Sequence, residues 1–228
     1  MLLLILGRGK TGSQVAEVAR ARGHSVRVIG EEENRSASAL TAPFLAGFDA
    51  AIDFTTPEAA VQNMRACLAN GARVVVGTTG WYAHLADMRD LTLRKGGALL
   101  YSTNFSVGVQ ALFRVARELA LAAPGYQFHI TETHHATKKD APSGTALSLQ
   151  RILESASPGL DVGITSKREG EVPGTHIVEA RSENDCITLS HDAFSRRGFA
   201  EGAVRAAEWI SGKTGCWDFQ DIVEGLGK

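Results

Sequence analysis

The sequence predicts an α/β protein, with a parallel sheet covered by helices on both faces and then a smaller domain of α+β character. In the first half, apolar runs alternate with amphipathic helical segments, which is typical of parallel sheets. Each predicted strand ends in a small, polar or glycine-rich stretch. That suits an extended ligand, because ligands bind beyond the carboxyl ends of such strands. After Asn104 the alternation stops, and a long helix precedes several alternating strands.

The elements of the first half follow from local signals in chain order. Strands are expected at 2–6, 25–30, 49–55, 72–79 and 97–102. The first helix is expected over 13–23, because its apolar spacing is helical and Gly23 is a natural C-terminal cap. Thr56 caps the second helix, with Pro57 at its first position and Glu58 in its first turn. That helix is expected to reach residue 71, and a third to span 81–95.

The second half mixes helices with alternating strands. A helix over 107–123 precedes a strand over 126–135 and a capped helix over 142–156. Strands at 161–169, 175–182 and 186–193 follow, and the polar turn at 183–185 joins the last two into a hairpin. A final helix is expected over 199–212. The change of pattern predicts a domain boundary near residue 105.

Composition excludes several classes of function. The 228 residues include 24 basic and 25 acidic side chains, so a net charge of −1 gives no general attraction to nucleic acid or anionic membranes. No segment is long and apolar enough to cross a membrane. Met1–Leu6 reads as a buried strand rather than a signal peptide, because glycines and Lys10 follow at once. The three cysteines lie outside metal-ligand spacing, and we interpret them as reduced thiols of a cytoplasmic protein.

The loop after the first strand, Gly7-Arg8-Gly9-Lys10-Thr11-Gly12, has the G-x-G-x-x-G pattern. Gly7 permits a tight turn, Gly9 lets the backbone approach a pyrophosphate, and Gly12 lets the helix pack on the strand. The free N–H groups of the helix N-terminus favour phosphate. Glu31, 19 residues after Gly12, would accept hydrogen bonds from the adenine ribose. The loop therefore predicts a Rossmann-like site for NADH and/or NADPH.

Two other interpretations of this loop compete with a dinucleotide site. The P-loop of nucleotide triphosphatases would need glycine at position 4, where Leu4 stands, which excludes it. A tight structural turn without a cofactor is disfavoured by the polar ends of the other strands. A 2′-phosphate would meet three acids at Glu31–Glu33, which Arg8 and Arg35 could offset. We therefore expect NADH to serve at least as well as NADPH.

The stretch THHATKKDAPSGTA (133–146) places two histidines and two lysines before a helix. It offers an acid/base that titrates near neutral pH, fixed positive charge, and helix N–H groups around Gly144 and Thr145, with Ser143 as cap. A small carboxylate ligand that accepts a proton fits this set. A metal site is the weaker alternative, because adjacent histidines are poor chelators and lack a suitably spaced carboxylate or thiol. A merely solvated basic loop also remained open on these residues alone.

At this stretch the sequence resembles the 4-hydroxy-tetrahydrodipicolinate reductase (dihydrodipicolinate reductase) family. The resemblance rests on Glu132-Thr133-His134-His135-x-x-Lys138-x-Asp140-Ala141-Pro142-Ser143-Gly144-Thr145-Ala146. It extends over the whole chain, through the glycine loop, Asp53-Phe54-Thr55, Gly77-Thr78-Thr79, Asn104-Phe105-Ser106, Val172-Pro173-Gly174 and Ser195-Arg196.

The resemblance implies the chemistry and the roles of these residues. His134 is expected to be the proton donor, Lys138 to assist catalysis by stabilising charge, and His135 to bind substrate. The backbone at Ser143, Gly144 and Thr145 is expected to hold a carboxylate of a small dicarboxylate ring, which is reduced at C4 in lysine and diaminopimelate biosynthesis. The dinucleotide contacts are expected from Gly7, Arg8, Gly9, Lys10, Thr11, Gly12, Glu31, Phe54, Thr55, Gly77, Thr78, Thr79, Thr103, Asn104, Phe105 and Ser106.

The resemblance also implies the domain organisation. The dinucleotide-binding domain is expected at 1–105 with 197–228, and the substrate-binding and tetramerisation domain at 106–196, in a homotetramer. Arg196 would contact cofactor or pair with an acid. Ala136 and Thr137 replace larger, often basic residues, which weakens one possible substrate contact. Glu32 stands where an arginine marks relatives that use NADP, which again favours NADH.

Two other functions compete with the reductase. Another two-domain NAD-dependent amino-acid dehydrogenase is disfavoured by the continuous histidine–lysine signature. A dinucleotide-sensing regulatory protein is disfavoured because His134 and Lys138 are both present. Turnover distinguishes the sensor, since a sensor binds NADH without consuming it.

Overall fold

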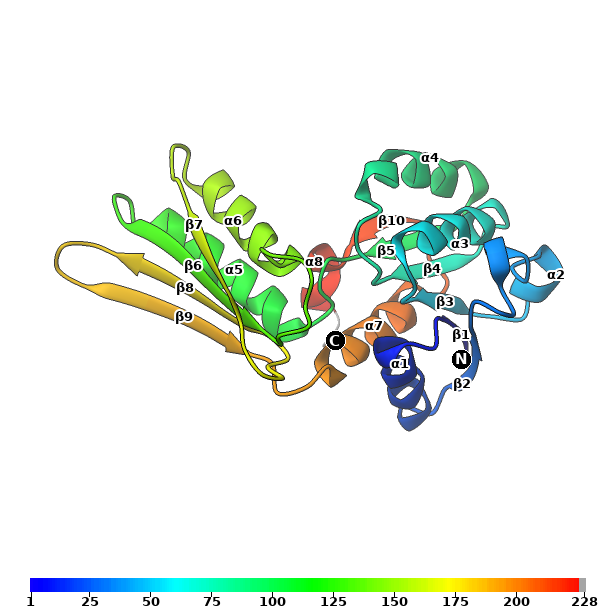
Figure 1. Cartoon of the computed structure of the whole chain (residues 1–228). Coiled ribbons are helices and arrows are strands. Elements are labelled where there is room, and N and C mark those ends of the chain that lie inside the picture. Colours follow the sequence, from blue (N-terminus) through cyan, green and yellow to red (C-terminus); the bar gives the residue numbers. More distant parts are fainter. Residues whose placement is uncertain (226–228) are drawn as a thin grey trace. The chain divides into compact units, whose positions relative to one another are not determined.

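The computed structural model describes residues 1–225, which form two compact units (Figure 1). One unit comprises Met1–Ser106 and the C-terminal segment from Arg197, and the other comprises Val107–Arg196. The sequence-based prediction places the boundaries after residues 105 and 196, and the roles of the two domains stay predictions. Among the described residues, no helix combines the length and the apolar character that a bilayer span requires.

The first unit contains a six-stranded parallel sheet. Its strands are β1 (Leu2–Leu6), β2 (Ser25–Ile29), β3 (Ala50–Asp53), β4 (Arg73–Val76), β5 (Ala98–Tyr101) and β10 (Gly215–Asp218). Their spatial order is β10-β5-β4-β3-β1-β2, and every neighbouring pair is parallel. The predicted parallel sheet is confirmed. The sequence did not predict β10, which extends the sheet beyond β5.

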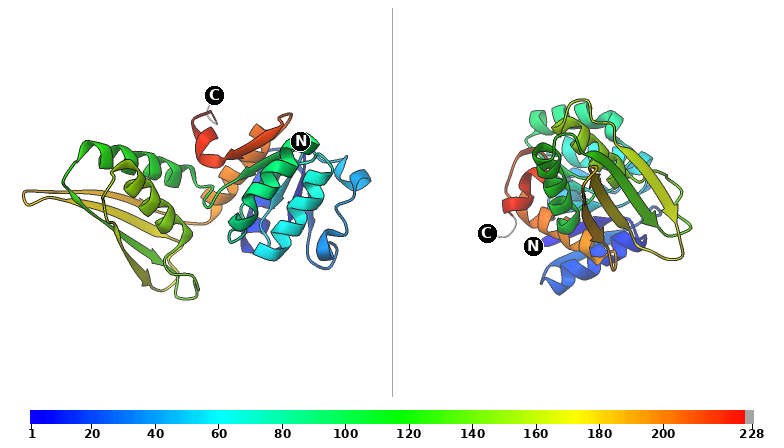
Figure 2. Two further views of the ribbon diagram at one scale, coloured as in Figure 1. Left: turned by 90° about the horizontal axis from the view of Figure 1, so that it is seen from above. Right: turned by 90° about the vertical axis from the view of Figure 1, so that its left-hand side faces the viewer.

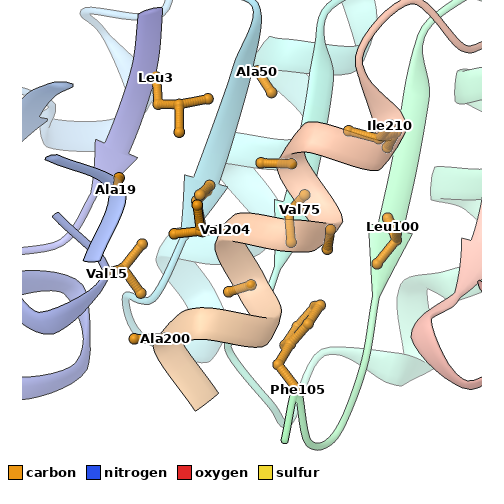
Figure 3. Close-up of a cluster of buried hydrophobic side chains, with 14 of the residues drawn as sticks. Leu3, Val15, Ala19, Ala50, Val75, Leu100, Phe105, Ala200, Val204 and Ile210 are labelled. Atoms are coloured by element: carbon orange, nitrogen blue, oxygen red, sulfur yellow. The ribbon is translucent and has the colours of Figure 1, made fainter. Parts of the chain in front are cut away.

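Helices cover both faces of this sheet. On one face, α1 (Lys10–Ala21) and α7 (Arg197–Ile210) bury small and branched residues such as Val15 and Val204 against Leu3, Val75 and Leu100 (Figure 3). On the other face, α3 (Pro57–Ala69) and α4 (Leu85–Lys95) pack on the alternate strand residues. Because successive side chains of a strand point to opposite faces, strands buried on both sides need continuous apolar runs such as LLLIL.

Shorter helices complete the first unit. They are the 3₁₀ helices η1 (Arg35–Ala37), η2 (Tyr82–His84) and η3 (Val223–Gly225), and the short α-helices α2 (Ala42–Leu45) and α8 (Phe219–Ile222). The first helix was predicted to start at residue 13, but α1 starts at Lys10, with Gly9 as N-cap. The last three residues of the glycine motif therefore form its first turn.

The second unit pairs a four-stranded sheet with two helices. The helices are α5 (Val107–Ala122) and α6 (Gly144–Ala156), and the strands are β6 (Gln127–His134), β7 (Gly163–Arg168), β8 (Thr175–Arg181) and β9 (Cys186–Asp192). The order is β7-β6-β8-β9; β7 runs parallel to β6, and the other pairs are antiparallel. The predicted hairpin, β8–β9, is confirmed. Figure 2 shows α5 and α6 on the same side of the strands, where they bury Phe128, Ile130 and Val178.

Candidate active site

A cavity of about 540 Å³ lies in the first unit beyond the carboxyl ends of β1, β2 and β3. The strand order reverses there, because β1 lies between β2 and β3, and ligands of open α/β sheets bind at such switch points. Six of the sequence-predicted cofactor residues line this cavity: Gly7, Arg8, Gly9, Glu31, Phe54 and Thr55. The remaining predicted cofactor residues lie in the first turn of α1 and in the loops after β4 and β5.

The glycine loop is shaped by close backbone contacts. A Cβ atom at Gly12 would lie 2.2 Å from the carbonyl oxygen of Gly7, so only glycine lets α1 start there. Gly7 has φ of +108°, and a Cβ atom on it would lie 2.3 Å from the Phe54 oxygen. At Gly9, by contrast, no atom lies within 4 Å of such a Cβ. This open space beside the helix N-terminus fits a pyrophosphate.

Asp53 joins the loops that follow β3 and β4. Its carboxylate accepts hydrogen bonds from the Thr55 and Thr78 hydroxyls, each at 2.7 Å, and from the Asn63 amide at 2.7 Å. Burial raises the pKa of this fully buried carboxyl, and these hydrogen bonds oppose the rise. Asn63 in turn accepts from Asn34 Nδ2 at 2.8 Å. Asp53 had no predicted role, yet its carboxylate holds Thr55 and Asn63, two residues that line the cavity.

The loops after β4 and β5 carry the other predicted dinucleotide residues. A Cβ atom at Gly77 would lie 2.2 Å from the Phe54 ring, so glycine makes room for that ring. Ser106 N donates to Asn104 Oδ1 at 2.8 Å, and Asn104 N donates to Ser102 Oγ at 3.1 Å. These hydrogen bonds hold the loop immediately before α5 in a fixed form.

The three acids at Glu31–Glu33, which were expected to repel a 2′-phosphate, have different surroundings in the structure. Glu33 accepts from Gly30 N at 3.1 Å and pairs with the Arg8 guanidinium, so its charge is balanced. Of the three acids, Glu31 lines the cavity, and Arg35 lines it as well. The electrostatic case against a 2′-phosphate is therefore weaker than the count of acids implied.

A buried polar cluster in the second unit surrounds His134. Because strand residues alternate, Glu132 and His134 share the face of β6 that carries Phe128 and Ile130 into the apolar core. The Glu132 carboxylate contacts His134 Nδ1, and it accepts a hydrogen bond from Arg168 Nη2 at 2.8 Å. His176 of β8 lies opposite Glu132 in the register, and its ring contacts the His134 ring edge to face, with centroids 5.2 Å apart.

The charges of this cluster follow from its contacts. Burial would raise the pKa of Glu132, but hydrogen bonds from Arg168 and Ser166 and the charge of His134 lower it to about 2. Burial lowers the pKa of His134 below its usual range; Glu132 opposes this, while Lys138 and Arg168 lower it further. Burial lowers the pKa of His176 to about 3, so that ring is neutral at physiological pH.

Lys138 and His135 occupy the loop that follows β6. Lys138 Nζ donates to both carboxylate oxygens of Asp140, at 2.6 and 2.8 Å. His135 lies outside the buried face; its Nδ1 contacts Thr137 Oγ1 at 2.8 Å, and its Nε2 accepts from Arg196 at 3.2 Å. The contact of Arg196 with cofactor or with an acid stays a prediction; in this structure Arg196 donates to His135.

Ser143, Gly144 and Thr145 lie at the start of α6, as expected. Ser143 is the N-cap, and its hydroxyl accepts from Ala146 N at 3.2 Å. The same hydroxyl lies 3.3 Å from His176 Nε2, which links the helix cap to the polar cluster. No atom lies within 4 Å of a Cβ built at Gly144, so the cap is open to a ligand.

Glu132, His134 and His176 could also hold a metal ion, since their potential ligand atoms all lie within 4.8 Å of one another. In this structure, however, the carboxylate is already engaged by His134 and Arg168. A cation would have to displace the guanidinium. The sequence-based expectation of no metal therefore stays a prediction.

Four residues around this site had no predicted role: Glu132 and Asp140, which belong to the family signature, and Arg168 and His176, which lie outside it. Glu132 was detectable, because the period of two along the strand places it on the face of His134. Arg168 and His176 come from β7 and β8, and only the strand register brings them beside His134 and Glu132.

Comparisons with known proteins cover the chain from its first residues to its C-terminal segment. Family models described as dihydrodipicolinate reductase match residues 1–105 (N-terminus) and 108–223 (C-terminus). A 4-hydroxy-tetrahydrodipicolinate reductase of Christiangramia forsetii is 38% identical over all of both chains. One of Natronomonas pharaonis is 36% identical over 98% of this chain and all of its own.

The fold has a counterpart among solved structures. The dipicolinate-bound dihydrodipicolinate reductase from Paenisporosarcina sp. TG-14 superposes with a TM-score of 0.78 at 23% identity, covering 97% of this chain and 99% of its own. Two family models and two full-length relatives above 30% identity thus agree on one assignment. The chain belongs to the dihydrodipicolinate reductase family.

Proposed function

We propose that this chain catalyses the pyridine-nucleotide-dependent reduction of 4-hydroxy-tetrahydrodipicolinate, the reaction for which its curated relatives are named. The observation that carries the proposal is the environment of His134. This buried histidine contacts the Glu132 carboxylate and is within electrostatic reach of Lys138. The His176 ring lies between it and the Ser143 helix cap. The chain that carries this arrangement matches both family models.

The chain's own residues suit this chemistry. The helix cap at Ser143–Thr145 supplies positive potential for a substrate carboxylate. His134 donates a proton through Nε2, because Nδ1 is engaged by Glu132. Lys138 stabilises negative charge and is held in place by Asp140.

The dinucleotide would bind in the cavity at the switch point of the first sheet. The open space at Gly9, the N-terminus of α1 and the carboxylate of Glu31 fit a pyrophosphate and an adenine ribose. Bound there, NADH or NADPH supplies the hydride. NADH is proposed to serve at least as well as NADPH, with Arg35 as the residue that accepts a 2′-phosphate. Arg35→Ala should raise the KM for NADPH more than that for NADH.

The chain is further proposed to act in the cytoplasm as a homotetramer, without nucleic acid or membrane partners. Helices α5 and α6 pack on one face of the second sheet. Its other face presents the second set of alternating residues, such as Thr131, Ile177 and Thr188, for contact between copies. Size-exclusion chromatography with light scattering tests this, and a monomeric mass at micromolar concentration would contradict it.

The function is tested by following the oxidation of NADH and NADPH with substrate made in situ from pyruvate and aspartate semialdehyde by the preceding enzyme. His134→Gln should lower kcat by about a hundredfold or more, the range for loss of a general acid. His84→Gln, at an exposed histidine of η2, is the matched control and should leave kcat unchanged. If folded, NADH-binding protein shows no substrate-dependent oxidation, the dinucleotide-sensor alternative replaces the reductase.

A further inference from the structure

The His134 side chain is oriented by a carboxylate that comes from its own strand. Glu132 is fully buried, with 0% exposure, and lies two residues before His134 on the same face of β6. A buried carboxylate costs free energy unless it is paired and hydrogen-bonded. Here the pairing comes from Arg168, whose place beside His134 is set by the parallel register of β6 and β7.

Arg168 is itself held at a fixed position. Its Nη2 atom donates to Glu132 Oε1 at 2.8 Å and to the backbone oxygen of Asp140 at 2.6 Å, while Nη1 donates to the Lys167 oxygen. A guanidinium is always protonated and can only donate. Arg168 therefore keeps Glu132 ionised, and an ionised carboxylate can only accept.

The state of Glu132 fixes the tautomer of His134. The contact of Nδ1 with an acceptor-only carboxylate requires the proton to be on Nδ1. In the neutral ring, Nε2 is then the basic nitrogen. A Cβ atom at Gly174 would lie 3.1 Å from this Nε2, so the lack of a side chain at residue 174 leaves Nε2 uncovered on that side.

We propose that Glu132, paired with Arg168, is the positioning residue of His134: it holds the proton on Nδ1, so that Nε2 is the atom that exchanges a proton with the substrate. This rests on the proposed role of His134. The ionisable groups that face His134 are Glu132 on β6, Lys138 in the following loop, Arg168 on β7 and His176 on β8. Of these four groups, Glu132 favours the protonated His134 ring, whereas the positive charges of Lys138 and Arg168 disfavour it and the His176 ring is neutral.

The first test needs no substitution in the proposed pair. Wild-type protein with ¹⁵N-labelled histidine is studied by NMR above the pKa of His134, and the His134 signals are assigned by their loss in His134→Gln. The expected result is a protonated Nδ1 and an unprotonated Nε2 in the neutral ring. A neutral His134 that carries its proton on Nε2 would overturn the inference, whether or not the protein reduces the proposed substrate.

The second test is kinetic. Glu132→Gln should lower kcat by about 10- to 100-fold, the range found when the partner that orients a metal-bound histidine is removed. It should also move the basic limb of the pH profile by about one unit or more to lower pH, because the charge that favours the imidazolium is lost. Glu132→Asp should return the limb towards its wild-type position.

Glu118→Gln is the matched control. Glu118 lies on α5 of the same unit and is exposed, and it contacts Arg117. Its replacement should change neither kcat nor the pH profile. A Glu132→Gln protein with a wild-type pH profile and an unchanged tautomer would refute the positioning role. If that variant does not fold, the tautomer measured in wild type decides the question.

Discussion

Gly202 of helix α7 is the position where the first unit is most sensitive to one added methyl group. A Cβ atom there would lie 1.7 Å from the carbonyl oxygen of Phe105 and 2.8 Å from its carbonyl carbon. Phe105 is itself buried (Figure 3). Its ring centroid lies 4.8 Å from that of Phe219. Gly202→Ala would therefore force the helix and the loop that precedes α5 apart.

The magnitude follows from two opposing effects. Overpacking of a filled core costs about 1–3 kcal/mol, and contact with backbone rather than a flexible side chain places this case near the upper end. Replacing glycine by alanine inside a helix returns about 1 kcal/mol. We expect a net loss of about 2 kcal/mol, which lowers Tm by roughly 4–8 °C in a chain of this size.

Differential scanning calorimetry measures this loss, with Gly198→Ala as the matched control on the same helix. A Cβ atom at Gly198 would lie 3.9 Å from Ser106 Oγ, which is an ordinary contact, so the control should be neutral or slightly stabilising. Titration with NADH should also show weaker binding in Gly202→Ala, since Phe105 belongs to a loop proposed to contact the dinucleotide. Equal Tm values for the two variants would refute the steric reasoning.

Three further predictions concern single side chains. Gly9→Ala should leave Tm unchanged, since no atom lies near the added methyl, yet weaken NADH binding measured by fluorescence. Asp53→Asn should lower the free energy of unfolding, measured in urea, by about 1–3 kcal/mol, because an amide in place of Asp53 Oδ2 would face the Asn63 donor. The same change should raise the KM for NADH, and a wild-type KM would contradict this. Burial raises the pKa of Asp218 to about 6, so the folded protein favours the protonated form of this carboxyl. The free energy of unfolding should therefore fall by at most about 3 kcal/mol as pH rises from 4 to 6 and the carboxyl loses its proton. Asp218→Asn, which keeps the cap to Gln220 N, should remove that dependence in thermal scans.

The sequence by itself determined the elements whose signals are local. The glycine loop, the Thr56-Pro57 helix start and the Ser143 cap each depend on residues adjacent in the chain, and the structure has all three. The continuous apolar runs predicted a parallel sheet, because only strands covered on both faces need them. The period of two along β6 likewise put Glu132 and His134 on one face, although only the histidine was given a role.

Tertiary structure decided the contacts that depend on strand pairing. β10 is a four-residue strand with no pattern of its own, and it exists because β5 offers an open edge for it. Arg168 meets Glu132 across 36 residues of sequence, and His176 meets it only through the register of β8. A shift of one residue in either pairing would turn these side chains to the opposite face, so no local signal encodes them. His134 and Lys138 were therefore visible in the sequence, whereas the Glu132–Arg168 pair and the ring of His176, which lie around His134, became apparent only when the sheet was assembled.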